Sequence, residues 1–344
     1  MNAYQRVMNT LTGAPVDRLP VFAVLGAYGG KLTNTDLRTL YSDAGAYVAG
    51  QKALQAEFGF DLVLCPFDFS AISEAFGGEV AWCADQVPNM KRPAVQEVAA
   101  ALRLPLPDPE VTGRLPFILE ATRRLSQIYR EQVPLIGVLP GPGILPALFV
   151  GMDRWMDTVL FDAAGARELM DHTGSFLVSW ANALLAAGAD CLVFTEGMAA
   201  AEIVPRGIFE GQFLPHLAQV FARIAGPKVV SSTGGSMNHV LDLFPGLEGL
   251  VGVSAGSRDD LAVARRLLGT ELTLIGNLDN LTLPTASAAE VTQLSLARLR
   301  SSGASGHFIL GNSGADLPQA TPPENLRAML EAAKSYSKEI GCGI

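Results

Sequence analysis

The chain has 344 residues, of which 49% are hydrophobic and 17% charged, with a formal net charge of −9. No basic run could follow a phosphate backbone, so binding to nucleic acid or to an anionic membrane surface is not expected. The chain carries neither a signal-peptide pattern nor an apolar run of the about 18 residues that a membrane span needs, and four cysteines without a CxxC pair indicate free thiols. We therefore expect a cytoplasmic protein, and the low charge fraction makes a homodimer plausible.

Short apolar runs rich in Val, Ile and Leu recur along the chain and predict strands that are buried on both faces. They occupy residues 19–25, 61–65, 134–139, 191–194, 228–230, 250–253, 272–275 and 307–310. Helical periodicity lies between them, at 165–187, 209–224, 259–268, 288–301 and 323–340. This alternation indicates right-handed βαβ units, and eight strands favour a closed (β/α)8 barrel (a TIM barrel) of the α/β class. An open parallel sheet is the alternative.

One stretch, at about 83–116, interrupts this rhythm, because it is rich in proline and polar residues. Apolar runs continue on both sides of it. We interpret it as an excursion between the second and third barrel strands, within one domain that covers residues 1–344.

Residues just after the strands of a barrel face its functional pocket. Three acids have such positions: Asp68, Glu196 and Asp279. A carboxylate in a partly apolar cup acquires a raised pKa and can act as an acid or a base. The structural alternative is that each caps a helix or pairs with a cation, and Asn277 and Asp279 could cap the turn that follows them.

The segment 231–235, SSTGG, follows the fifth predicted strand. Its hydroxyls and backbone N–H groups could bind an anion, or it could cap a helix predicted at 237–244. No HxxxH or HxC spacing occurs, so the sequence does not predict a zinc site.

Several segments, taken together and in order, resemble the uroporphyrinogen decarboxylase superfamily, and most closely its methylcobamide:coenzyme M methyltransferase branch. These segments are RVMNTLTGAPVDRLPV, FGFDLVLCPFDFSAISEAFGGEV, AAGADCLVFTEGMAAAEIVP, IGNLDN and TPPENLRAML. The resemblance covers nearly the whole chain. It implies a barrel with a tetrapyrrole or corrinoid site at its mouth.

The resemblance also implies site residues. Asp68 corresponds to a pocket aspartate of the decarboxylases, with Phe67 beside it. Tyr28 lies in the loop after the first strand, where the decarboxylases have an arginine and this chain has none. The zinc ligands of the methyltransferase branch correspond here to Ser231, Thr233 and Ser313. Hydroxyls are poor zinc ligands, so no zinc is expected.

Three functions follow as hypotheses. The first is a corrinoid-linked methyltransferase without zinc, acting on a cobamide that is free or carried by a partner corrinoid protein. Asp68 and Glu196 would orient or deprotonate a small-molecule substrate, and the hydroxyls, Asn277 and Asp279 would bind it. The second is a decarboxylase or lyase acting on a small acid, for which Arg206 is a candidate carboxylate partner, although its place after Pro205, near a helix start, is more typical of a surface residue. The third is a non-catalytic protein that binds a tetrapyrrole, a corrinoid or another small ligand.

Overall fold

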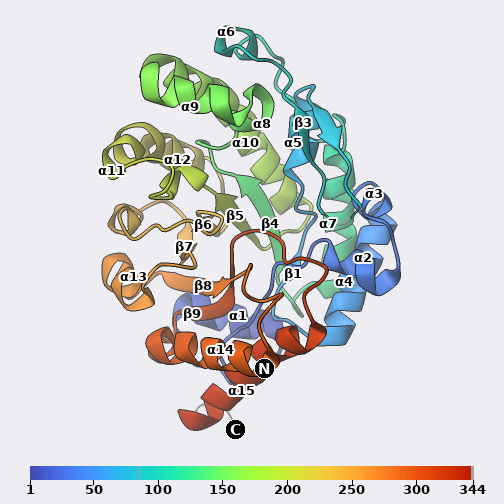
Figure 1. Ribbon diagram of the computed structural model, residues 1–344, viewed down its shortest axis with the longest axis vertical. Helices are drawn as coiled ribbons and strands as arrows, with labels where there is room; N and C mark the ends of the chain where they lie inside the picture. The colour runs from blue at the N-terminus through green and yellow to red at the C-terminus, as the bar shows by residue number, and fades with distance from the viewer. Residues whose placement is uncertain (85, 342–344) are drawn as a thin grey trace.

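A computed structural model describes residues 1–84 and 86–341, so Cys342 lies outside the described residues. Parallel strands form one curved seven-stranded sheet in the order β1-β4-β5-β6-β7-β8-β9, and helices surround it (Figure 1). The strands are β1 Val63–Leu64, β4 Leu135–Pro140, β5 Cys191–Thr195, β6 Lys228–Ser231, β7 Leu250–Ser254, β8 Thr273–Asp279 and β9 Phe308–Ser313. Seven of the eight predicted strands are therefore confirmed.

Helices follow most of the strands and cover the outer face of the sheet. The α-helices are α1 Ala3–Thr12, α2 Tyr28–Thr33, α3 Leu37–Leu40, α4 Ala44–Phe58, α5 Phe69–Ala75, α6 Val98–Ala101, α7 Leu115–Tyr129, α8 Ala147–Val150, α9 Met152–Phe161, α10 Ala163–Ala186, α11 Arg206–Ile208, α12 Leu214–Phe221, α13 Leu261–Leu268, α14 Ala288–Ser302 and α15 Pro323–Glu339. Short 3₁₀ turns are η1 Gly197–Ala199, η3 Leu241–Leu243 and η4 Gly303–Ser305, and η2 Phe209–Phe213 is a π-helix. The helix expected at 237–244 is reduced to η3.

The segment 19–25 forms a single bridge, between Val21 and Leu310 of β9, instead of the expected strand. On its other side, the backbone N–H of Asp61 donates to the carbonyl of Val21 at 2.9 Å. The N–H of Val24 donates to the side-chain oxygen of Asn312 at 2.8 Å. Because the side chain of Asn312 accepts the hydrogen bond that a backbone carbonyl of β9 would accept in a continued ladder, the pairing between 19–25 and β9 stops after one residue.

The described part of the excursion, residues 83–84 and 86–116, packs as an accessory layer beside α5. Its β3 (Asn89–Arg92) pairs antiparallel with β2 (Glu79–Ala81), which begins before the predicted excursion. The chain then passes through α6 and returns to the barrel-like body at α7.

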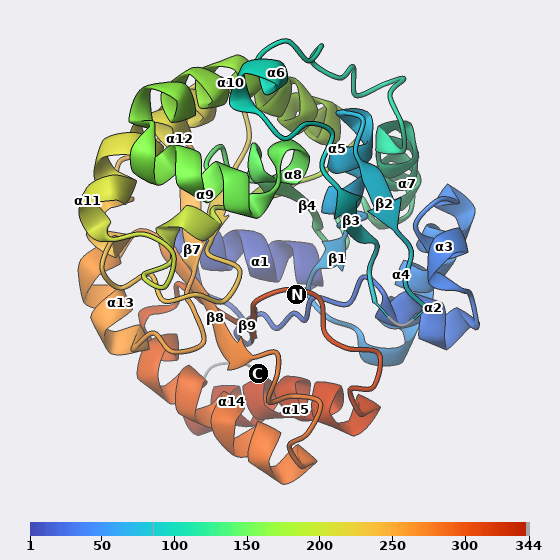
Figure 2. The same cartoon turned by 45° about the horizontal axis from the view of Figure 1, so that its top comes forward.

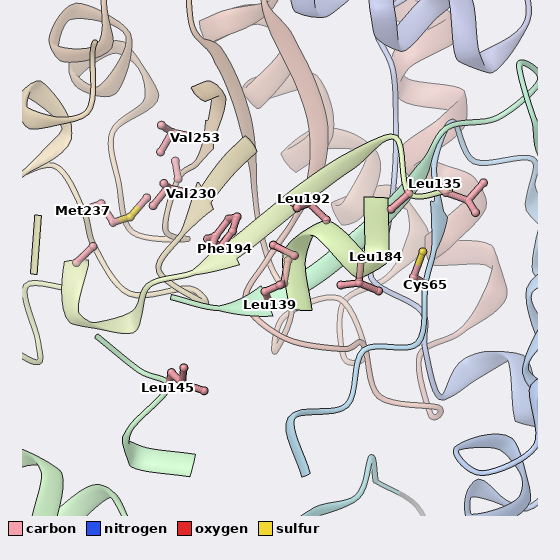
Figure 3. Close-up of a cluster of buried hydrophobic side chains, with 14 of the residues drawn as sticks. Cys65, Leu135, Leu139, Leu145, Leu184, Leu192, Phe194, Val230, Met237 and Val253 are labelled. Atoms are coloured by element: carbon pink, nitrogen blue, oxygen red, sulfur yellow. The ribbon is translucent and has the colours of Figure 1, made fainter. Parts of the chain in front are cut away.

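The strands divide their side chains between two faces, as alternation requires. Outward residues such as Leu139, Leu192, Phe194 and Val230 pack with helix residues such as Leu184 of α10 in one large core (Figure 3). Each such side chain contributes about 1.5–3 kcal/mol on burial, so this outer layer supplies most of the hydrophobic stabilisation.

The inward residues form a second, smaller cluster. Cys191, Val229, Ile275 and Ile309 belong to it, together with Val7 of α1. Helix α1 lies across the middle of the ring of helices (Figure 2). It is fastened there by an ion pair of 2.6 Å between Arg6 and the buried Asp61. This helix therefore closes the amino-terminal end of the strands.

None of the helices within 1–84 and 86–341 is long and apolar enough to cross a membrane. The thiols of Cys65, Cys83 and Cys191 are free.

Candidate functional site

A cavity of about 110 Å³ runs through the space that the strands enclose. Its floor is made by Val7, Met8 and Leu11 of α1. Its walls are inward side chains of the strands, which include Ile136, Val138, Val193, Val229, Ile275 and Ile309. We call this cavity the shaft. Because the carboxyl ends of parallel strands carry the functional loops of such folds, the opposite end of the shaft is the candidate site.

Hydroxyl groups surround that upper end. Thr195, Ser231, Thr233 and Ser254 all line the shaft and form what we call the hydroxyl collar. Ser231 and Ser254 are the last residues of β6 and β7. The N–H of Thr233 donates to the Ser231 hydroxyl at 3.2 Å, and the backbone of Thr233 has a φ of 59°. Asn312 and Gly314 complete the rim, and Phe67 also lines the shaft.

The third residue expected at a metal-ligand position, Ser313, ends β9. It is 1% exposed, and its hydroxyl has no hydrogen-bond partner in the part of the chain that the structure describes. The hydroxyl lies 3.8 Å from the place that a Cβ on Gly234 would occupy. Ser313 therefore lies beside the loop that carries Thr233, although it does not line the shaft.

These three hydroxyl residues do not fit a zinc ion. Zinc in proteins is held by thiolate, imidazole or carboxylate ligands, and neutral hydroxyls are poor substitutes. Over residues 1–84 and 86–341, no three His, Cys, Asp or Glu side chains gather closely enough to hold a metal ion.

Asp68, a predicted catalytic residue, is the N-cap of α5. One carboxylate oxygen accepts from the Ser70 backbone N–H at 2.8 Å and from its hydroxyl at 2.6 Å. The other oxygen pairs with the guanidinium of Arg114. The Asp68 side chain is fully buried. Burial raises its pKa, and the positive charge of Arg114 opposes that rise.

Arg114 reaches Asp68 from the end of the excursion. It also donates to Glu74 of α5 at 2.7 Å and to the Ser70 hydroxyl at 2.8 Å. Its guanidinium carbon lies 4.7 Å from the ring centroid of Trp82, a cation–π contact. Asp68 does not line the shaft, so its catalytic role stays a prediction. Sequence reasoning missed Arg114, since nothing local marks its partner 46 residues away.

Glu196, the second predicted catalytic residue, is fully buried at the end of β5. Its carboxylate accepts from the backbone N–H of Gly143 at 2.8 Å and of Met198 at 3.2 Å. Burial raises its pKa from 4.5 to about 7. A Cβ on Gly141 would lie 2.3 Å from this carboxylate. A side chain at position 141 would therefore crowd Glu196, and the hydrogen bond from Gly143 joins Glu196 to the β4–α8 loop. Its catalytic role also stays a prediction.

Asn277 and Asp279 lie within β8 and not in the loop that the sequence predicted. The Asn277 amide donates to the carbonyls of Gly256 and Asp259, at 2.6 and 3.0 Å, and is turned away from the shaft. Asp279 accepts from the N–H of Leu281 at 3.0 Å and stabilises the turn after the strand. This is the capping role that the sequence offered as the alternative to ligand binding.

Tyr28 is 1% exposed in α2, where its hydroxyl donates to the carbonyl of Thr321 at 3.0 Å. It is thus not brought to the shaft. Asp316, which the sequence did not single out, accepts from the N–H groups of Gly26 and Ala27 at 2.6 and 2.9 Å. Burial raises its pKa to about 7. This carboxylate ties the segment after β9 to the loop before α2.

A curved parallel sheet wrapped in helices, with polar side chains gathered at its carboxyl ends, defines an α/β fold of the barrel type. The chain belongs to the uroporphyrinogen decarboxylase (URO-D) family, whose sequence model matches residues 2–336.

The similarity extends along the whole chain. A methylcobamide:CoM methyltransferase (MtbA) of Methanosarcina acetivorans is 26% identical over 96% of this chain and 97% of its own length. A uroporphyrinogen decarboxylase of Albidiferax ferrireducens is 25% identical over 92% of this chain and 86% of its own. The solved structure of a methyltransferase from Methanosarcina mazei superposes with a TM-score of 0.87 at 19% identity, covering 98% of this chain and 99% of that one.

Proposed function

We propose that this protein is a corrinoid-linked methyltransferase that transfers a methyl group between a cobamide and a small molecule, without zinc. One observation carries this proposal: an apolar shaft that ends in hydroxyls, in a chain similar along 96% of its length to a methylcobamide methyltransferase. The cobamide, free or on a partner corrinoid protein, would face the hydroxyl collar. We further propose that residues 19–25 close the sheet into an eight-stranded barrel around the shaft.

The methyl transfer can be written as a balanced reaction that uses no zinc ion. When a methylcobamide gives up its methyl group, the carbon–cobalt bond breaks and both electrons stay on cobalt, which passes from Co(III) to Co(I). The methyl carbon bonds to a lone pair of the acceptor, and the acceptor's proton leaves to solvent. Ser231, Thr233 and Ser254 would orient that lone pair through hydrogen bonds.

Decarboxylation of an acidic substrate is a weaker explanation of this site. A carboxylate-rich substrate needs cationic partners. The described residues that line the shaft include no Lys, Arg or His. Arg206 does not supply one, because it is 41% exposed and pairs with Asp242 at 2.6 Å. Arg114 is already held by Asp68 and Glu74.

The test is an anaerobic reaction of the purified protein with methylcobalamin and a panel of acceptors that includes tetrahydrofolate, several thiols and neutral phenols. Visible absorbance reports loss of the carbon–cobalt bond, and metal content is measured on the same sample. We expect demethylation that depends on one acceptor, proceeds with zinc absent and falls at least about tenfold in Thr233→Val. Ser257→Ala, a hydroxyl change outside the shaft, serves as the control.

Two results would overturn the proposal. If no acceptor supports demethylation although the protein binds a small ligand, the protein is a non-catalytic binding protein. Stoichiometric zinc that is required for activity would show that the hydroxyl residues do not define a metal-free site.

A further inference from the structure

We infer that the small-molecule substrate is a neutral compound with an apolar body about the size of one aromatic ring and a single ether, hydroxyl or thioether group. The body would occupy the shaft and the polar atom would meet the hydroxyl collar. This inference rests on the proposed function in so far as the bound molecule is the methyl donor or acceptor.

The walls of the shaft border open space. In a filled barrel the inward side chains interdigitate and are fully buried. Here Ile136, Val138 and Val193 are only half-buried, although they lie on central strands of the sheet. These β-branched side chains line the cavity and leave it unfilled. The space between them is consequently lined by methyl groups and suits an apolar ligand.

The size of the shaft selects the body of the ligand. Its volume is about 110 Å³. A dry apolar cavity of about 150 Å³ in another protein binds benzene. The shaft is smaller than that cavity, so one ring, or an aliphatic chain of similar bulk, is the largest body that it holds between α1 and the collar, and a tetrapyrrole would have to remain outside the upper end.

Charge excludes acids from the shaft. Asp190 and Cys191 are the ionisable groups among the described residues that line it. Burial raises the pKa of both, that of Cys191 to about 12. Among the described residues that line the shaft there is no Lys, Arg or His whose charge could compensate an anionic ligand. Moving an unpaired carboxylate or sulfonate into such a space is strongly unfavourable.

The collar provides the polar contact. Within residues 1–84 and 86–341, the hydroxyls of Thr233 and Ser254 have no hydrogen-bond partner. When a ligand displaces the water around a hydroxyl group, a hydrogen bond between that hydroxyl and the ligand stabilises the complex. Two donors at one end of an apolar space match a molecule with one lone-pair-bearing atom at one end of an apolar body.

Titration calorimetry with methoxybenzene and with 4-methoxybenzoate as probes tests the inference. The two molecules share the ring and the methoxy group and differ by one carboxylate. We expect methoxybenzene to bind the wild-type protein at least about tenfold more tightly than 4-methoxybenzoate. Equal or tighter binding of the benzoate would overturn the inference.

Variants locate the probe. Val193→Phe fills the shaft and should weaken methoxybenzene binding at least about tenfold, and Val193→Leu should weaken it less. Val111→Phe makes the same change on an exposed residue (75% exposed) and should leave binding unchanged. If Val193→Phe does not fold, as judged by circular dichroism, the Leu variant and Thr233→Val decide. Undiminished binding in a folded shaft variant would contradict the inference.

The binding experiment contains no cobamide, so its outcome is separable from the proposed function. Binding of methoxybenzene without methyl transfer would keep the inference and remove the methyltransferase. Methyl transfer to an acidic acceptor, with no binding of methoxybenzene, would do the reverse.

Discussion

Arg114 lies near the end of the excursion and forms an ion pair with Asp68, the N-cap residue of α5. The Arg114 side chain is 11% exposed and that of Asp68 is fully buried. The pair therefore joins the accessory layer to the carboxyl end of β1 through a contact shielded from water.

Replacing Arg114 by leucine should lower the free energy of unfolding by about 3–5 kcal/mol, because it leaves a buried carboxylate without its partner. The urea midpoint, followed by circular dichroism, measures this. The double change Arg114→Leu with Asp68→Leu should recover part of the loss, since the orphaned charge is then removed.

Arg123→Leu provides the comparison, because Arg123 pairs with Glu110 at the surface, where the two side chains are 41% and 56% exposed. Such a pair contributes less than about 1 kcal/mol. If Arg114→Leu and Arg123→Leu lower the free energy of unfolding by similar amounts, the buried pair stabilises the protein no more than the exposed pair.

Glu196 should make the protein less stable as the pH rises. Its pKa is raised from 4.5 to about 7 by burial, so between these values the folded protein keeps a proton that the unfolded chain has released. The unfolding free energy should fall across this window by about 3 kcal/mol on account of Glu196 and level off above pH 7. Glu196→Gln should remove that portion of the pH dependence, measured by urea unfolding at several pH values.

Glu290 is a control of opposite sign. It is an exposed capping residue of α14, and hydrogen bonds from Ser287 lower its pKa. Its contribution to stability is lost as the pH falls. A Glu196→Gln profile parallel to that of the wild type would contradict the assignment of a proton to the buried carboxyl.

Gly141→Ala should destabilise the protein by about 1–3 kcal/mol through overpacking. The added Cβ would lie 2.3 Å from the Glu196 carboxylate and 2.9 Å from its backbone. Gly207→Ala, in α11, meets nothing within 4 Å and should be neutral or stabilising by up to about 1 kcal/mol. Thermal unfolding compares the two, and equal melting temperatures would contradict the close approach of Glu196 to the loop.

The triple change Ser231→His, Thr233→Cys and Ser313→Cys should create a zinc site, because it places one imidazole and two thiolates where the wild-type protein has hydroxyls. We expect about one zinc per chain in the variant and substoichiometric zinc in the wild type, measured by elemental analysis after dialysis. The pair Ser231→His and Thr233→Cys alone should bind zinc more weakly. Failure of the triple variant to bind zinc would show that Ser313 does not face the other two residues.

The sequence predicted the fold well where periodicity is long. Helix α10 spans Ala163–Ala186, against an expected 165–187, because apolar residues repeat regularly over many turns. The first strand was overestimated: residues 19–25 are as apolar as a strand, but the side chain of Asn312 intercepts the backbone after Val21. Such competition between side chain and ladder is not visible in local composition.

The site was predicted in part. Ser231 and Thr233 line the shaft because strand ends converge in any parallel sheet of this kind. Asp68 and Glu196 were recognised as strand-end acids, but whether each faces the ligand or the protein depends on Arg114 and on Gly143, which are distant in sequence. Ser254 also follows a predicted strand, but it was given no binding role, although its place at the end of β7 is the same signal that selected Ser231.

The position of α1 beneath the strands has an evolutionary consequence. The length of the shaft is set by Val7, Met8 and Leu11, three side chains on one helix, and the polar chemistry is set at the other end by residues from different strands. Ligand length and ligand chemistry are thus encoded in separate parts of the gene. A shorter side chain at Met8 would lengthen the shaft while every hydroxyl of the collar is kept, so the length of the accepted ligand can change without a change in its polar contact.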